Sequence, residues 1–90
     1  MASLRRLKKD IDFLMEEVIS DCCTFMYLYP DKKREEAIDI IQNAVELRNK
    51  LYAEVNNPQD NPRKAYYKAV NQELVEGVDL LFQRISELTK

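Results

Sequence analysis

Hydrophobic residues recur every three or four positions along three segments of the chain, which is the spacing of one face of an α-helix. These segments cover about residues 3–28, 32–56 and 62–89. The first stripe consists of Leu4, Leu7, Ile11, Leu14, Met15, Val18, Cys22, Phe25 and Met26. The second consists of Ala37, Ile38, Ile40, Ile41, Ala44, Val45, Leu47, Leu51, Tyr52 and Val55. The third consists of Tyr66, Val70, Leu74, Gly77, Val78, Leu81, Ile85 and Leu88.

Two short segments with turn-forming residues separate these helices, one around Pro30 and one at 56–62. Side chains that cap helix N-termini stand before each segment, and they predict starts at Ser3, Asp31 and Asn61. Pro62 then occupies the first helical position, where its missing N–H costs nothing. Helices of this length joined by short connections must lie beside one another. The sequence therefore predicts an all-α fold, an antiparallel up-down-up three-helix bundle that forms a single domain over residues 1–90.

Composition agrees with this fold and narrows the chemistry. One Gly and three Pro in 90 residues leave few turns for a sheet protein. The net charge is -2 with both signs interspersed, so no general attraction to nucleic acid or lipid is expected. The chain has no His, so any general base would be a carboxylate, Cys, Lys or Tyr. No apolar stretch reaches the length of a membrane span or a signal peptide, and we expect a soluble cytoplasmic protein.

The apolar surface exceeds what a single bundle needs. Val75 and Phe82 widen the stripe of the third helix on one flank, while Leu80 and Ala69 lie on the other, and Phe13 stands well off the stripe of the first helix. One interpretation places these residues in a broad core. The other is an interface with a second chain, formed by Phe13, Val75, Phe82, Tyr66 and Tyr67. The core interpretation is favoured for each residue taken singly, while a thin bundle that exposes apolar rows gains most from self-association, so a homodimer is the expected oligomeric state.

Arg48 falls near the centre of the apolar stripe of the second helix, which is an unusual place for a charge. A guanidinium there could form a buried ion pair or anchor an anion or carboxylate. Alternatively, its stem packs on the core while its head reaches solvent or pairs with an acid such as Glu17 or Glu73.

Acidic residues raise the alternative of a carboxylate-metal enzyme. The antiparallel arrangement places Asp21, Asp39 and Asp79 at similar heights, and carboxylates on facing helices can hold Mg²⁺ or Mn²⁺. Glu36-x-x-Asp39 is similar to half of the metal motif of the all-alpha nucleotide pyrophosphohydrolases, which implies a nucleotide hydrolase. The other half is incomplete, because Ser20 stands where a Glu would be expected.

Three further features receive structural interpretations. The basic run of Arg5, Arg6, Lys8 and Lys9 has too few charges and no interleaved aromatic residues, so a solvated helix start is favoured over nucleic-acid binding. Cys22 and Cys23 are adjacent on a helix and cannot readily bridge each other, and without a basic neighbour Cys22 is expected in the core. Gly77 is expected to permit the close approach of another helix.

No residue cluster defines a catalytic centre or a cofactor site. The leading hypothesis is a non-enzymatic protein-protein interaction or dimerisation module. The alternatives are a metal-dependent nucleotide hydrolase and a weak nucleic-acid binder that uses the N-terminal basic run.

Overall fold

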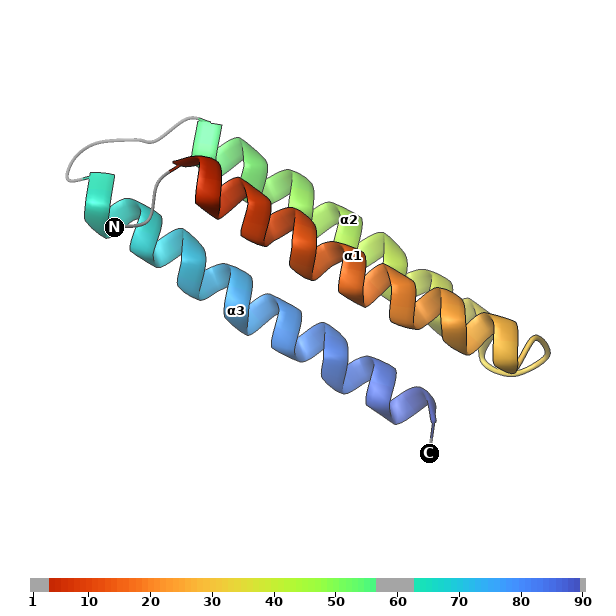
Figure 1. Cartoon of the computed structure of the whole chain (residues 1–90). Helices are drawn as coiled ribbons and strands as arrows, with labels where there is room; N and C mark the ends of the chain where they lie inside the picture. The colour runs from red at the N-terminus through yellow and green to blue at the C-terminus, as the bar shows by residue number, and fades with distance from the viewer. Residues whose placement is uncertain (1–3, 57–62, 90) are drawn as a thin grey trace.

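A computed structural model describes residues 4–56 and 63–89, which form three α-helices (Figure 1). The helices are α1 (Leu4–Leu28), α2 (Arg34–Asn56) and α3 (Arg63–Leu88), and every pair is in contact. The chain runs up α1, down α2 and up α3, so α1 and α3 are parallel (Figure 1). The molecule is a thin rod of 49 × 19 × 18 Å. The predicted all-α three-helix bundle is confirmed, while the predicted caps Ser3 and Asn61 and the position of Pro62 lie outside the described residues.

The core is one continuous apolar cluster along the axis of the rod, and all three helices contribute to it. Its buried members are Leu7, Ile11, Met15, Val18, Cys22, Phe25, Ala37, Ile40, Ala44, Leu51, Val55, Val70, Leu74, Val78, Leu81 and Leu88. Each of them lies on a stripe predicted from the spacing. Ile38 and Val45 were expected on the inner face of α2 but are 38% and 41% exposed, because a helix with two neighbours buries a narrower arc than the predicted stripe covers.

The turn between α1 and α2 closes differently from the prediction. Lys32 N donates a hydrogen bond to Tyr29 O at 3.1 Å, and Pro30 occupies the second position of this turn, which its fixed φ suits. Lys33 adopts a left-handed conformation with φ 49°. Its carbonyl accepts the first bond of α2, from Ala37 N at 3.1 Å. The helix therefore begins at Arg34, and the prediction of Asp31 as its cap is wrong because Asp31 lies inside the turn.

Candidate functional site

The five residues predicted to form an interface differ in exposure and do not share one face. Phe13 is 61% exposed and Val75 is 53% exposed, whereas Phe82, Tyr66 and Tyr67 are partly buried against the core. Tyr66 faces α2, since its hydroxyl donates to the Glu54 carbonyl oxygen at 2.8 Å. Val75 follows nine residues later and lies on the opposite flank of α3, because each helical residue turns by about 100°. The predicted group is therefore divided between two sides of α3.

The flank of α3 that faces α2 holds a groove that the prediction did not include. Its floor is Gly77, where an added Cβ would lie 2.6 Å from Leu47 Cδ2, so α2 and α3 approach closely at this point. A cavity of about 460 Å³ opens along this contact. Its lining comes from both helices and consists of Asn43, Leu47, Gly77, Leu80, Leu81, Gln83, Arg84 and Glu87. Gly77 thus permits the close helix approach that its position predicted.

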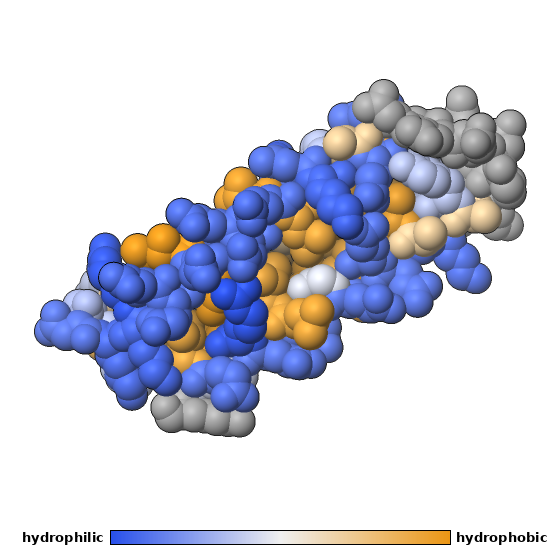
Figure 2. Space-filling view, turned by 180° about the vertical axis from the view of Figure 1, so that it is seen from behind, coloured by the Kyte–Doolittle hydropathy of each residue, from blue (hydrophilic) through white to orange (hydrophobic). Residues whose placement is uncertain are grey.

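Leu80 stands at the rim of this groove and is 60% exposed. It lies among apolar neighbours, since Leu47 and Leu81 line the same cavity. The face that α2 and α3 present shows apolar side chains gathered along the rod between hydrophilic ones (Figure 2). A large exposed leucine beside an apolar cavity is the type of surface that binds other polypeptides.

Arg84 forms the polar edge of the groove. Its Nη1 donates to Asn43 Oδ1 at 2.6 Å, and its Nη2 lies 3.7 Å from Asp39 Oδ2. The side chain remains 41% exposed, and a guanidinium carries five N–H donors. Arg84 is therefore held in place by α2 with donors left for a further acceptor.

An acidic cluster lies further along the same α2–α3 boundary. Lys50 forms an ion pair with Glu73, which is itself adjacent to Glu54. Burial raises the pKa of the Glu54 carboxyl above its usual value of 4.5, and hydrogen bonding and repulsion from Glu73 raise it further. Two carboxylates thus share one lysine, and this end of the groove has an excess of negative charge.

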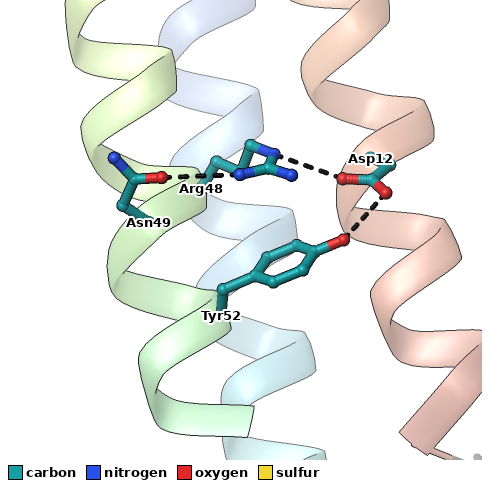
Figure 3. Close-up of polar contacts among 4 residues, drawn as sticks. All are labelled: Asp12, Arg48, Asn49 and Tyr52. Carbon is teal, nitrogen blue, oxygen red and sulfur yellow. Dashed lines mark hydrogen bonds and ion pairs between the residues drawn. The ribbon is translucent and has the colours of Figure 1, made fainter. Parts of the chain in front are cut away.

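Arg48 forms a polar contact between α2 and α1 (Figure 3). Its Nε donates to Asp12 Oδ1 at 3.3 Å, and the Tyr52 hydroxyl donates to Asp12 Oδ2 at 2.8 Å. The guanidinium also lies over the Tyr52 ring, 4.3 Å from its centroid. Burial, followed by Asp12, raises the pKa of the Tyr52 hydroxyl.

The predictions for Arg48 need correction in two respects. The Arg48 and Asp12 side chains are 41% and 45% exposed, so the ion pair is half-exposed rather than buried. The partner is Asp12 rather than Glu17 or Glu73, because the flank of α2 that carries Arg48 faces α1 while Glu73 pairs with Lys50. The alternative interpretation, in which the head of Arg48 reaches the surface and pairs with an acid, is confirmed.

The residues considered for metal binding are not gathered in the structure. Within residues 4–56 and 63–89, no three Asp, Glu, Cys or His side chains come close enough to hold an ion. Asp21, Asp39 and Asp79 are all exposed, as is Glu36. The similar heights predicted for these carboxylates do not direct them to a common point.

The cysteines and the basic run also have defined surroundings. Cys22 is a buried free thiol, and burial, with smaller contributions from Cys23 and Asp21, raises its pKa to about 11. A thiol with so high a pKa is a poor nucleophile at neutral pH, which agrees with its predicted role in the core.

In the basic run, Lys8 is half-buried with its Nζ 5.9 Å from the Tyr52 ring centroid, while Arg5, Arg6 and Lys9 are exposed.

Comparison of the chain with protein-family models, curated proteins and solved structures found no significant match. Across the part of the chain that the structure describes, no helix is long and apolar enough to traverse a lipid bilayer.

Proposed function

We propose that this protein is a non-enzymatic interaction module that associates with itself as a homodimer. The observation that supports this proposal is the amount of large apolar surface left exposed by a bundle whose core is already complete. The exposed large hydrophobic residues are Phe13, Tyr27, Leu28, Tyr29, Ile38, Val45, Val75 and Leu80. Single exposed apolar residues are ordinary, but this many of them on a rod only 18–19 Å thick favour association.

Association through a two-fold axis is the arrangement that suits such a rod. In a symmetric dimer each residue contributes twice, so a modest patch on one protomer buries double its area. A rod 49 Å long offers a full helix length for this contact. Pairing two copies along their helices would bury exposed apolar residues of both copies.

Sedimentation equilibrium on the purified chain tests this proposal. We expect a mass of twice 10.6 kDa at tens of micromolar, falling toward the monomer mass on dilution. A constant monomer mass throughout this range would contradict the proposal.

We further propose that the protein works in a reducing compartment such as the cytoplasm, in keeping with its free buried Cys22 and free exposed Cys23.

A further inference from the structure

Four residues of α3 form a stripe on the side that faces α2, and we call it the α3 stripe. They are Glu73, Gly77, Leu80 and Arg84. Their spacings of four, three and four residues are those of the contact positions in a helix pair, so they share one side of α3. Their contacts with α2 confirm this placement, since Glu73 pairs with Lys50, Gly77 lies against Leu47 and Arg84 binds Asn43.

The centre of this stripe combines a projection with a hollow. Leu80 projects with 60% of its surface exposed, and beside it Leu47 of α2 packs against Gly77, which has no side chain of its own. The adjoining cavity of about 460 Å³ falls within the range of roughly 300–1,000 Å³ in which proteins hold ligands. Leu80 stands at the rim of this cavity and leaves it unfilled. A second copy turned by a two-fold axis could place its own Leu80 there.

We infer that two copies of this chain dimerise through antiparallel contact of their α3 stripes, with Leu80 of each copy seated over Gly77 of the other. This inference rests on the proposed homodimer and specifies its interface. The two-fold axis passes midway between Gly77 and Leu80, which makes both contacts equivalent. The α2 side chain Leu47 lies against the incoming leucine, so the second copy occupies the groove between α2 and α3.

Charge complementarity supports the same register independently of shape. The midpoint between Gly77 and Leu80 is also the midpoint between Glu73 and Arg84 along α3. An axis that seats Leu80 over Gly77 therefore brings Glu73 of each copy opposite Arg84 of the other. Glu73 shares one lysine with Glu54 and can accept further hydrogen bonds, while Arg84 retains exposed donors. Each dimer thus gains two pairs of opposite charge at the ends of the apolar contact.

Two matched substitutions on α3 test the location of the interface. Leu80 and Val75 are 60% and 53% exposed on different flanks of the helix, so a charge at either position leaves the core intact. We expect Leu80→Glu to raise the dimer dissociation constant by at least about tenfold, as for a central interface residue. Val75→Glu should leave the constant unchanged, and circular dichroism should show both variants fully helical.

Charge reversal at the ends of the stripe tests the register. Arg84→Glu places a carboxylate opposite Glu73 of the second copy, and Glu73→Lys places an ammonium opposite Arg84. Each variant alone should dimerise at least about tenfold more weakly than the wild-type chain, because like charges then face each other twice. An equimolar mixture should form a heterodimer with near wild-type affinity, because both contacts again join opposite charges. Loss of folding would weaken the variants alone but could not produce this recovery on mixing.

The outcomes separate this inference from the proposed function. A wild-type chain that remains monomeric contradicts both the proposed homodimer and the α3 interface. A wild-type dimer that tolerates Leu80→Glu, or that dissociates with Val75→Glu instead, overturns the α3 interface while the homodimer stands. A dimer weakened by Leu80→Glu whose reversed-charge variants do not recover on mixing overturns the antiparallel register.

Discussion

At the scale of single residues, polar side chains on the flanks of the helices form the contacts between neighbouring helices that are not apolar. Asp12 accepts hydrogen bonds from Arg48 and Tyr52, so one carboxylate of α1 holds two side chains of α2. The stacking of the guanidinium on the Tyr52 ring adds a further contact between consecutive turns of α2. This cluster fixes the register of the α1–α2 pair, because Asp12 reaches both partners only at one height.

Removing Asp12 or the Tyr52 hydroxyl should lower the free energy of unfolding. We expect Tyr52→Phe to cost about 0.5–1.5 kcal/mol, the usual net contribution of one hydrogen bond. Asp12→Ala should cost about 1–2 kcal/mol, since it also removes the half-exposed ion pair with Arg48. Because the two residues share one hydrogen bond, the double variant should cost less than both single changes together. Urea unfolding measures all three, and strict additivity would contradict this contact.

Glu54 should make stability depend on pH. The pKa of Glu54 is higher in the folded protein than in the unfolded chain, where it lies near 4.5. Its favourable contribution to the free energy of unfolding is therefore complete below pH 4.5, and it is lost as the pH rises through the pKa of the folded state. At pH 7 the charged carboxylate therefore destabilises the fold. Glu54→Gln removes this charge and can still donate to Glu73, and we expect a gain of up to about 0.5 kcal/mol at pH 7 that vanishes near pH 4.

Thermal unfolding at both pH values measures this effect. Glu16→Gln, at an exposed position on α1, is the control for the change in net charge alone. A gain for Glu54→Gln that is equal at pH 7 and pH 4 would show that burial and Glu73 are not its cause.

At the scale of helices, the spacing of apolar residues predicted the elements and their buried faces. All three helices form within two residues of their expected ends. The start of α2 was less predictable, because Lys33 adopts a left-handed conformation that lysine rarely takes. This reversal follows the turn closed by Tyr29 and Lys32, and no glycine or asparagine marks it in the sequence. Local residue preferences alone therefore placed the helix start two residues early.

Gly77→Ala should separate the stability of the bundle from its association. Alanine favours a helix interior by about 1 kcal/mol over glycine. Its methyl group would press on Leu47 Cδ2, the end of a flexible side chain beside a cavity, so Leu47 can move at little cost. We expect a net gain in unfolding free energy of about 0.5 kcal/mol together with weaker dimerisation.

Repeating the Gly77→Ala substitution in a Leu47→Ala variant tests whether the contact with Leu47 limits the gain. In Leu47→Ala the obstructing side chain is absent, and the same substitution at Gly77 should then give the full gain of about 1 kcal/mol. Destabilisation by more than about 1 kcal/mol in the wild-type background would show that α2 and α3 cannot adjust at this contact.

At the scale of the whole molecule, the surplus of apolar surface was predictable while its arrangement was not. Phe13 and Val75 lie off the stripes and are exposed, whereas Phe82, on the same flank as Val75, is partly buried. The groove at Gly77 depends on how α2 and α3 align, which brings Leu47 and Asn43 beside residues some thirty to forty positions away. Leu80 lay on the flank opposite Val75 in the sequence pattern, but only this alignment shows that it stands beside a cavity.

Two-dimensional NMR of the ¹⁵N-labelled chain across a dilution series tests the central claim most directly, because it reports residue by residue where two copies separate. The account predicts concentration-dependent amide shifts at Glu73, Gly77, Leu80 and Arg84 of α3 and at Leu47 of α2, with little change at Phe13 and Val75. Shifts centred on Phe13 and Val75, or spectra that do not change with concentration, would contradict it.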